Sequence, residues 1–254
     1  MSSLFHQSRG EGQPIILIHG FCETHAIWGP LSEHLPSDHQ VIAIDLPGFG
    51  QSPPAPEPAS IDSIAEHVQQ WIVDSGLNKP LLVGHSLGGY VCLSMIAQNP
   101  EIYSGLILFH STSRPDTVTK KINRLKVLEF VAAHGLHSYI DSFIPSLFHN
   151  KIKEDVDFAL NVAHGTRETT FVEYTKAMRD RPSRELVLHS ALVPTLLIAG
   201  KEDSIIPYVD LTEQVELNPE IQLYLMENVG HMGMLEAKKE AAKVVSRFAR
   251  TLKS

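Results

Sequence analysis

Ser86 has the surroundings that most clearly predict chemistry. It lies in the sequence Gly84-His85-Ser86-Leu87-Gly88-Gly89, between an apolar run at residues 81–83 and a stretch of helical composition. A serine at a sharp strand-to-helix turn projects its hydroxyl above the sheet, and the flanking glycines keep Cβ atoms out of the close contact between strand and helix. This pattern is typical of a nucleophile elbow, in which the serine attacks an acyl carbon.

Two later turns supply candidates for the base and the acid that an attacking serine needs. Asp203 lies in Gly200-Lys201-Glu202-Asp203 after one apolar run, and His231 lies in Gly230-His231 after the next. We expect His231 to accept the proton of Ser86 as general base. We expect Asp203 to orient the imidazole and to stabilise its charged form. The order serine, acid, histidine along the chain matches a triad built on a nucleophile elbow.

Two other acidic residues are set aside as the triad acid. Asp45 precedes Ser86, which breaks the order, and the Pro and Gly residues that follow it indicate a tight structural loop. Glu202 neighbours Asp203, and we expect its side chain to face solvent.

An acyl-transfer serine enzyme must also stabilise the oxyanion that forms during attack. Two backbone N–H groups do this, one from the residue after the serine and one from the loop after an earlier strand. The first would be Leu87. The second would be Phe21, which follows His19-Gly20 at the end of the apolar run 15–18. We therefore predict an oxyanion hole at the N–H groups of Phe21 and Leu87.

The candidate residues follow short apolar runs that predict a sheet. Most runs are continuous rather than alternating, as in strands buried on both faces, and helical stretches lie between them. This pattern predicts an α/β protein with a doubly wound, mostly parallel sheet, in which ligands bind beyond the carboxyl ends of the strands. The predicted strands are at residues 15–18, 41–44, 81–83, 106–109, 195–199 and 221–225, with helices at 28–35, 61–75, 87–98 and 235–252.

Residues 112–188 break this alternation. They hold few strand-like runs, and their helical stretches are at residues 118–133, 136–147, 151–163 and 168–178. An insertion between two core strands would lie over their carboxyl ends, so we predict a helical cap that acts as a lid. The core then consists of residues 1–111 and 189–254.

The chain resembles the α/β-hydrolase fold serine hydrolases, and among them the small cap-bearing esterase and perhydrolase-like branch. The resemblance covers residues 15–252 apart from the cap. Members usually begin with an antiparallel hairpin, whereas barely a dozen residues precede Ile15, so we expect one edge strand to be missing or vestigial. The matching segments are His19-Gly20-Phe21, Asp45-Leu46-Pro47-Gly48-Phe49-Gly50-Gln51-Ser52, Gly84-His85-Ser86-Leu87-Gly88-Gly89, Gly200-Lys201-Glu202-Asp203 and Gly230-His231.

Composition and charge argue against several classes of partner. The formal net charge is −8, no run of Lys or Arg reverses it locally, and the longest apolar stretches are strand-sized. We therefore expect no nucleic-acid and no membrane partner. The first seven residues lack the charged and apolar regions of a secretory signal, so we expect a cytoplasmic protein. The oligomeric state stays open.

Fourteen histidines raise the question of a metal site, but their spacing argues against one. His134 and His137 lack further ligands nearby in the sequence, and Cys22 and Cys92 form no metal or redox motif. We therefore expect no metal and no cofactor. We interpret His85, beside the nucleophile, as a packing residue.

These residues predict a serine hydrolase that cleaves a small or medium carboxylic ester through an acyl-enzyme intermediate, with a small-molecule acyl compound as substrate. A thioesterase, an amidase, a C–C bond hydrolase or a lyase would use the same triad, and a slowly turning-over ligand receptor of this fold is the alternative from another class. Dehalogenases and epoxide hydrolases of this fold need an aspartate nucleophile, so Ser86 argues against them. The candidate substrate-binding residues are His19, Gly20, His110, Phe143 and Met232, and for His110 a buried core role is the alternative.

Overall fold

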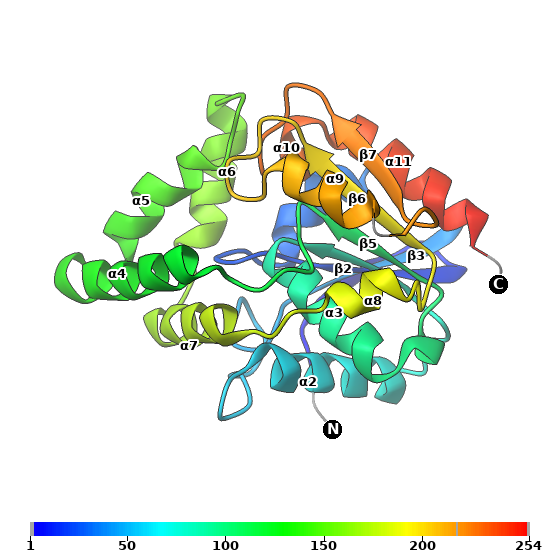
Figure 1. Ribbon diagram of the computed structural model, residues 1–254, viewed down its shortest axis with the longest axis horizontal. Coiled ribbons are helices and arrows are strands. Elements are labelled where there is room, and N and C mark those ends of the chain that lie inside the picture. Colours follow the sequence, from blue (N-terminus) through cyan, green and yellow to red (C-terminus); the bar gives the residue numbers. More distant parts are fainter. Residues whose placement is uncertain (1–2, 217, 253–254) are drawn as a thin grey trace.

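One sheet of seven strands forms the centre of the computed structural model, which describes residues 3–216 and 218–252 (Figure 1). The strand order is β1-β3-β2-β4-β5-β6-β7, with β1 antiparallel to its neighbour and every other pair parallel. The predicted doubly wound, mostly parallel sheet is therefore confirmed. The strands are β1 (His6–Arg9), β2 (Gln13–Ile18), β3 (His39–Ile44), β4 (Leu81–His85), β5 (Gly105–Phe109), β6 (Thr195–Gly200) and β7 (Gln222–Met226).

Residues of the central strands are buried on both faces of the sheet. In β2, Ile16 and Ile18 belong to one hydrophobic cluster and Ile15 and Leu17 to the other, and all four are fully buried. Successive side chains of a strand point to opposite faces, so a strand covered on both sides needs apolar residues at every position. This requirement explains the continuous apolar runs of the sequence.

Helices cover both faces of the sheet. A further short helix, η2 (Pro100–Ile102), precedes β5. The helix α2 begins where Ser60 accepts a hydrogen bond from the N–H of Ser63 (3.0 Å), and the Ser63 hydroxyl accepts from the N–H of Ser60 in return. One face is covered by α2 (Ile61–Asp74), α3 (Leu87–Gln98), α8 (Glu185–His189) and α9 (Tyr208–Glu216), the other by η1 (His25–Trp28), α1 (Gly29–Ser32), α10 (Gly233–Glu236) and α11 (Lys238–Thr251).

The segment between β5 and β6 is helical, and four of its helices gather on one side of the sheet in Figure 1. They are α4 (Val118–His134), α5 (Leu136–Ser146), α6 (Lys153–Ala163) and α7 (Glu168–Asp180). The helix α7 is tied to the loop after β3, because the Tyr174 hydroxyl donates to the Pro47 carbonyl (2.7 Å) and the Thr170 hydroxyl to the Gly48 carbonyl (3.0 Å). That this segment moves as a lid stays a prediction.

The amino-terminal edge of the sheet consists of β1, whose four residues are all exposed. It pairs with β3 from His6 opposite Ile44 to Arg9 opposite Val41. The described residues before it, 3–5, contain no strand. Among the described helices, none is long and apolar enough to cross a membrane.

Candidate active site

Ser86 lies at the turn between β4 and α3, in a strained backbone conformation (φ 47°, ψ −112°). Its N–H donates to the Phe109 carbonyl (3.0 Å), and its carbonyl accepts from the Gly89 N–H (3.0 Å) and the Ser111 hydroxyl (2.7 Å). A Cβ at Gly84 would lie 2.5 Å from the Gly89 nitrogen, so only glycine fits there. A positive φ at a non-glycine residue costs about 1–3 kcal/mol, and the surrounding hydrogen bonds hold the serine in it.

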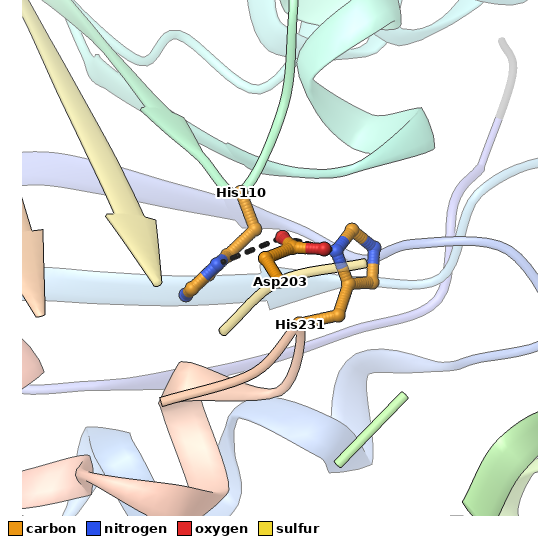
Figure 2. Close-up of side chains that lie close together, drawn as sticks. All are labelled: His110, Asp203 and His231. Carbon is orange, nitrogen blue, oxygen red and sulfur yellow. Dashed lines mark hydrogen bonds and ion pairs between the residues drawn. The ribbon is translucent and has the colours of Figure 1, made fainter. Parts of the chain in front are cut away.

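His231 and Asp203 form a buried hydrogen-bonded pair beyond the ends of β7 and β6 (Figure 2). His231 Nδ1 lies 2.7 Å from Asp203 Oδ2, while Asp203 Oδ1 accepts from the N–H groups of Ile205 (2.8 Å) and Ile206 (2.9 Å). Burial by itself would raise the pKa of Asp203, but the neighbouring His231 and His110 outweigh it and hold this pKa far below its usual range. Asp203 is therefore ionised and can stabilise a charged imidazole.

The loop that carries His231 is also bonded to the end of α5. The His231 N–H donates to the Leu147 carbonyl (2.8 Å). The Glu236 carboxylate accepts from the N–H of Gly230 (3.0 Å) and from the N–H groups of residues 149–150 (2.9 and 2.8 Å). One carboxylate thus joins the His231 loop to the turn after α5.

Ser86 and His231 line the same cavity, which has a volume of about 130 Å³. No hydrogen bond joins the Ser86 hydroxyl to His231 within the described residues; such contacts often tighten only when substrate binds. A larger cavity of about 500 Å³, against β1 and β3, contains no residue of the predicted triad. The smaller cavity is lined by Phe21, Glu23, His85, Ser86, Tyr90, Arg124, Val127, Tyr139, Phe143, Leu147, Thr175, Met178, Ile205 and His231.

The two predicted oxyanion donors lie at the places that the sequence indicates. Leu87 is the first residue of α3, where a helix leaves its N–H without an intrahelical acceptor. Phe21 follows β2, lines the cavity and lies with its ring centroid 4.9 Å from that of Phe171. No hydrogen-bond acceptor contacts either N–H in the part of the chain that the structure describes. Phe21 lines the cavity and Leu87 does not, so the oxyanion hole stays a prediction.

His110 lies behind the pair rather than in the cavity. Its Nδ1 is 3.3 Å from Asp203 Oδ2 and 3.2 Å from the Gly200 nitrogen, and the residue is fully buried. Burial lowers the pKa of His110 to about 4, although Asp203 opposes this shift. His110 is therefore uncharged at neutral pH. Its placement agrees with a buried core role and not with a wall of the substrate pocket.

His110, Asp203 and His231 also have the composition of a metal site, since their ligand atoms lie within 4.8 Å of one another. Figure 2 shows the Asp203 carboxylate between the two imidazoles. The 2.7 Å contact requires a proton on His231 Nδ1, which prevents that atom from binding a metal, and Asp203 Oδ1 is occupied by two N–H groups. We therefore interpret the cluster as a hydrogen-bond network.

Three further candidates for substrate binding do not line the cavity. His19 is fully buried, with Nδ1 2.8 Å from the Gly20 carbonyl and Nε2 accepting from the Leu46 N–H (3.0 Å), so both ring nitrogens serve the loops. Gly20 packs against His85, because a Cβ there would be 2.6 Å from His85 Nδ1. Met232 is fully buried. Of these five candidates, Phe143 alone lines the cavity.

His85 does more than the predicted packing, and its partner Glu23 is a residue that the sequence reasoning missed. His85 Nδ1 lies 3.0 Å from a Glu23 carboxylate oxygen, and Nε2 lies 3.0 Å from the His231 carbonyl. The same Glu23 oxygen accepts from the Gly20 N–H (2.6 Å). Burial alone would raise the pKa of Glu23, but His85 and this N–H lower it overall. No local motif pairs residues 62 positions apart, so this contact becomes visible only in the fold.

Asp45 and Glu202, the two acids not chosen for the triad, lie in a structural loop and at the surface, as expected. Asp45 is fully buried and accepts from the N–H groups of His25 (2.7 Å) and Gln51 (2.9 Å), which is a structural role in its loop. Glu202 is exposed.

Comparison with known proteins finds hydrolases among those that resemble this chain. Residues 13–129 match the family described as alpha/beta hydrolase fold. The structure resembles that of a thermophilic esterase from Thermogutta terrifontis, solved with malate bound, with a TM-score of 0.90 and 26% identity over 99% of this chain and 94% of that one.

Two curated relatives show similar levels of identity. A 2-hydroxy-6-oxo-6-(2'-aminophenyl)hexa-2,4-dienoic acid hydrolase from Metapseudomonas resinovorans is 25% identical over 94% of this chain and 84% of its own length. The dihydrolipoyllysine-residue acetyltransferase component of an acetoin cleaving system from Pseudomonas putida is 27% identical over 94% of this chain. The chain spans 64% of the length of that second protein.

Proposed function

Because the chain is an α/β-hydrolase fold hydrolase, we propose that it cleaves small carboxylic esters through an acyl-enzyme intermediate at Ser86. The observation that carries the proposal is the buried 2.7 Å pair of His231 and Asp203, which lies beside the cavity that Ser86 lines. A strained serine and an imidazole that share one cavity, with an ionised acid hydrogen-bonded to the imidazole, are the parts that acyl transfer needs.

In the proposed reaction, the Ser86 hydroxyl attacks the ester carbonyl carbon while His231 Nε2 takes its proton. The resulting oxyanion binds the N–H groups of Phe21 and Leu87. Asp203 keeps the proton of His231 on Nδ1, so that Nε2 is the basic nitrogen, and stabilises the imidazolium that forms. His231 then protonates the leaving alcohol. A water molecule, deprotonated by His231, then attacks the acyl carbon. The acid leaves as His231 gives that proton to the Ser86 oxygen.

A C–C bond hydrolase is the second candidate. The similarity to the Metapseudomonas resinovorans dienoic acid hydrolase supports it, since the same serine, histidine and acid could serve both reactions. An assay with a 2-hydroxy-6-oxo-dienoate beside an ethyl ester separates the two, because a C–C hydrolase prefers the dienoate.

The test of the proposal is the variant Ser86→Ala, measured on a panel of short-chain ethyl and aryl esters. We expect kcat to fall by at least about 10³-fold, with the far-UV circular dichroism spectrum unchanged. Ser138→Ala, at an exposed position on α5, is the matched control and should keep the activity of the parent. Full ester turnover by Ser86→Ala would show that the nucleophile is misassigned.

A serine-reactive phosphonate shows whether Ser86 is activated, and ester turnover measured beside it separates an enzyme from a receptor of the same fold. It should label the parent and Ser138→Ala, and leave Ser86→Ala unlabelled. Labelling without ester turnover would favour the receptor alternative.

The remaining sequence-based expectations stay proposals. We propose that residues 112–188 form a lid over the site. We also propose that the protein works in the cytoplasm on a small acyl compound, without nucleic-acid or membrane partners.

A further inference from the structure

We propose that the cavity selects esters that carry a second, ionised carboxyl group, such as monoesters of short dicarboxylic acids, and that Arg124 binds this carboxylate. The inference rests on the proposed ester hydrolysis and specifies its substrate class. It starts from one observation: a guanidinium from α4 lines the same small cavity as Ser86 and His231.

Arg124 belongs to a charge cluster that has more positive than negative groups. Its guanidinium bonds to Asp116 through Nε, and Nη2 lies 3.4 Å from the second oxygen of that carboxylate. Arg181 Nη1 donates to the same carboxylate (2.7 Å). Two guanidinium groups share one carboxylate, so the cluster keeps a net charge of +1 beside the cavity.

The two arginines of the cluster differ in their remaining donors. The Arg181 side chain is 5% exposed; it also donates to the carbonyls of Met178 (2.7 Å) and Arg114 (2.9 Å) and lies 3.9 Å above the Tyr90 ring. The Arg124 side chain is 23% exposed, and its Nη1 has no hydrogen-bond partner within residues 3–216 and 218–252. Arg124 is thus the member that has a donor left for a ligand.

No other group of the cavity wall neutralises this charge in the part of the chain that the structure describes. Glu23 is the one carboxylate among the lining residues, and it is paired with His85 (3.0 Å). Tyr139, Phe143 and Met178 contribute rings and apolar surface. A carboxylate that enters such a pocket loses its water, and it needs a cationic partner there. The planar guanidinium provides one, with a fork of N–H groups that matches the two oxygens.

The experiment compares two esters of the same shape in each variant. Monoethyl succinate carries the carboxylate, and ethyl 4-methylpentanoate has an isopropyl group in its place; a pH-stat follows both reactions. In the parent, kcat/KM for the monoester should exceed that for the neutral ester by at least about tenfold. In Arg124→Leu, this ratio should fall by about 30-fold, as expected for the loss of a charge-assisted hydrogen bond.

Two further variants separate the effect of the charge of Arg124 from that of its planar group. Lys126→Leu removes the same charge from an exposed position of α4 and should change the ratio by less than twofold. Arg124→Lys keeps the charge without the planar fork and should give an intermediate ratio. Asp116 keeps Arg181 as a partner when Arg124 is replaced, so the substitution leaves no unpaired buried charge.

The inference is overturned if the parent prefers the neutral ester, or if Arg124→Leu slows both esters equally. A binding measurement tests the carboxylate site independently of the proposed esterase activity. Calorimetry with succinate should give at least tenfold weaker binding for Arg124→Leu than for the parent. That result would support the carboxylate site even if the parent hydrolysed neither ester, whereas equal succinate binding would exclude it.

Discussion

Replacing Glu23 by glutamine tests how the base of the site is held in place. The Glu23 carboxylate accepts from His85 Nδ1 (3.0 Å) and from the Gly20 N–H (2.6 Å), and His85 Nε2 lies 3.0 Å from the His231 carbonyl. The His85 ring thus connects the Glu23 carboxylate to the backbone of the loop that carries His231. The side chains of both members of the pair are almost completely buried, at 0% and 3% exposure.

The expected effect of Glu23→Gln follows from this burial. Removing one partner of a buried ion pair typically destabilises a protein by about 3–5 kcal/mol. Glutamine has the same shape and keeps one acceptor oxygen, so we expect a loss of about 2 kcal/mol in the free energy of unfolding at pH 7. The kcat should also fall, because a weaker contact with residue 23 leaves the His85 ring, which bonds to the His231 carbonyl, less firmly positioned.

The pH dependence of the effect has a defined sign. The folded state lowers the pKa of Glu23, so the ionised pair stabilises the protein fully only above the unfolded-state pKa of about 4.3. This stabilisation is lost as the pH falls through the folded-state pKa. The gap between parent and Glu23→Gln in unfolding free energy should therefore be largest near pH 7 and shrink below about pH 4.

Urea unfolding of both proteins at several pH values measures this gap. Glu202→Gln is the matched control, since it removes the same charge from an exposed acid near the site and should leave stability within about 0.5 kcal/mol. A gap that does not change with pH would refute the ion-pair argument, as would full stability of Glu23→Gln at pH 7.

Two further substitutions test the triad and the attachment of α7. Asp203→Asn should lower kcat on ethyl esters by about 10³–10⁴-fold at neutral pH. The reason is that an amide can donate to His231 and favour the wrong tautomer of the imidazole. A loss below tenfold would show that Asp203 is not the triad acid. Tyr174→Phe leaves the Pro47 carbonyl without the hydroxyl donor of the fully buried Tyr174. It should lower the free energy of unfolding, measured by urea denaturation, by about 1–2 kcal/mol. An unchanged denaturation midpoint would show that this hydrogen bond is not stabilising.

The sequence predicts the sheet and the order of the candidate triad because each depends on local patterns. A strand buried on both faces must be apolar throughout, and a turn after it carries the functional residue, so Ser86, Asp203 and His231 can be read from runs and turns. The strand β1 has no apolar signal, since all its residues are exposed at the edge of the sheet.

Local sequence patterns cannot predict which side chains line the cavity. Arg124 faces the site because of how α4 packs on the rest of the protein, and nothing in its local sequence distinguishes it from Lys126. Glu23 and His85 become partners through the fold. His19 is the opposite case, in which a local pattern predicts a site residue that the fold uses elsewhere. Its position after a strand suggests a substrate-binding role, but both of its ring nitrogens bond to backbone groups of the loops.

The bonds between the His231 loop and the turn after α5 affect how this architecture can be re-engineered. The Leu147 carbonyl holds the His231 N–H, and Glu236 binds both the His231 loop and residues 149–150. The helical segment is therefore not an independent module that can be exchanged at β5 and β6 alone. A chimera that takes its helices from a relative must keep residues 147–150 of this chain, because their backbone groups bond to the His231 N–H and to the Glu236 carboxylate of the core.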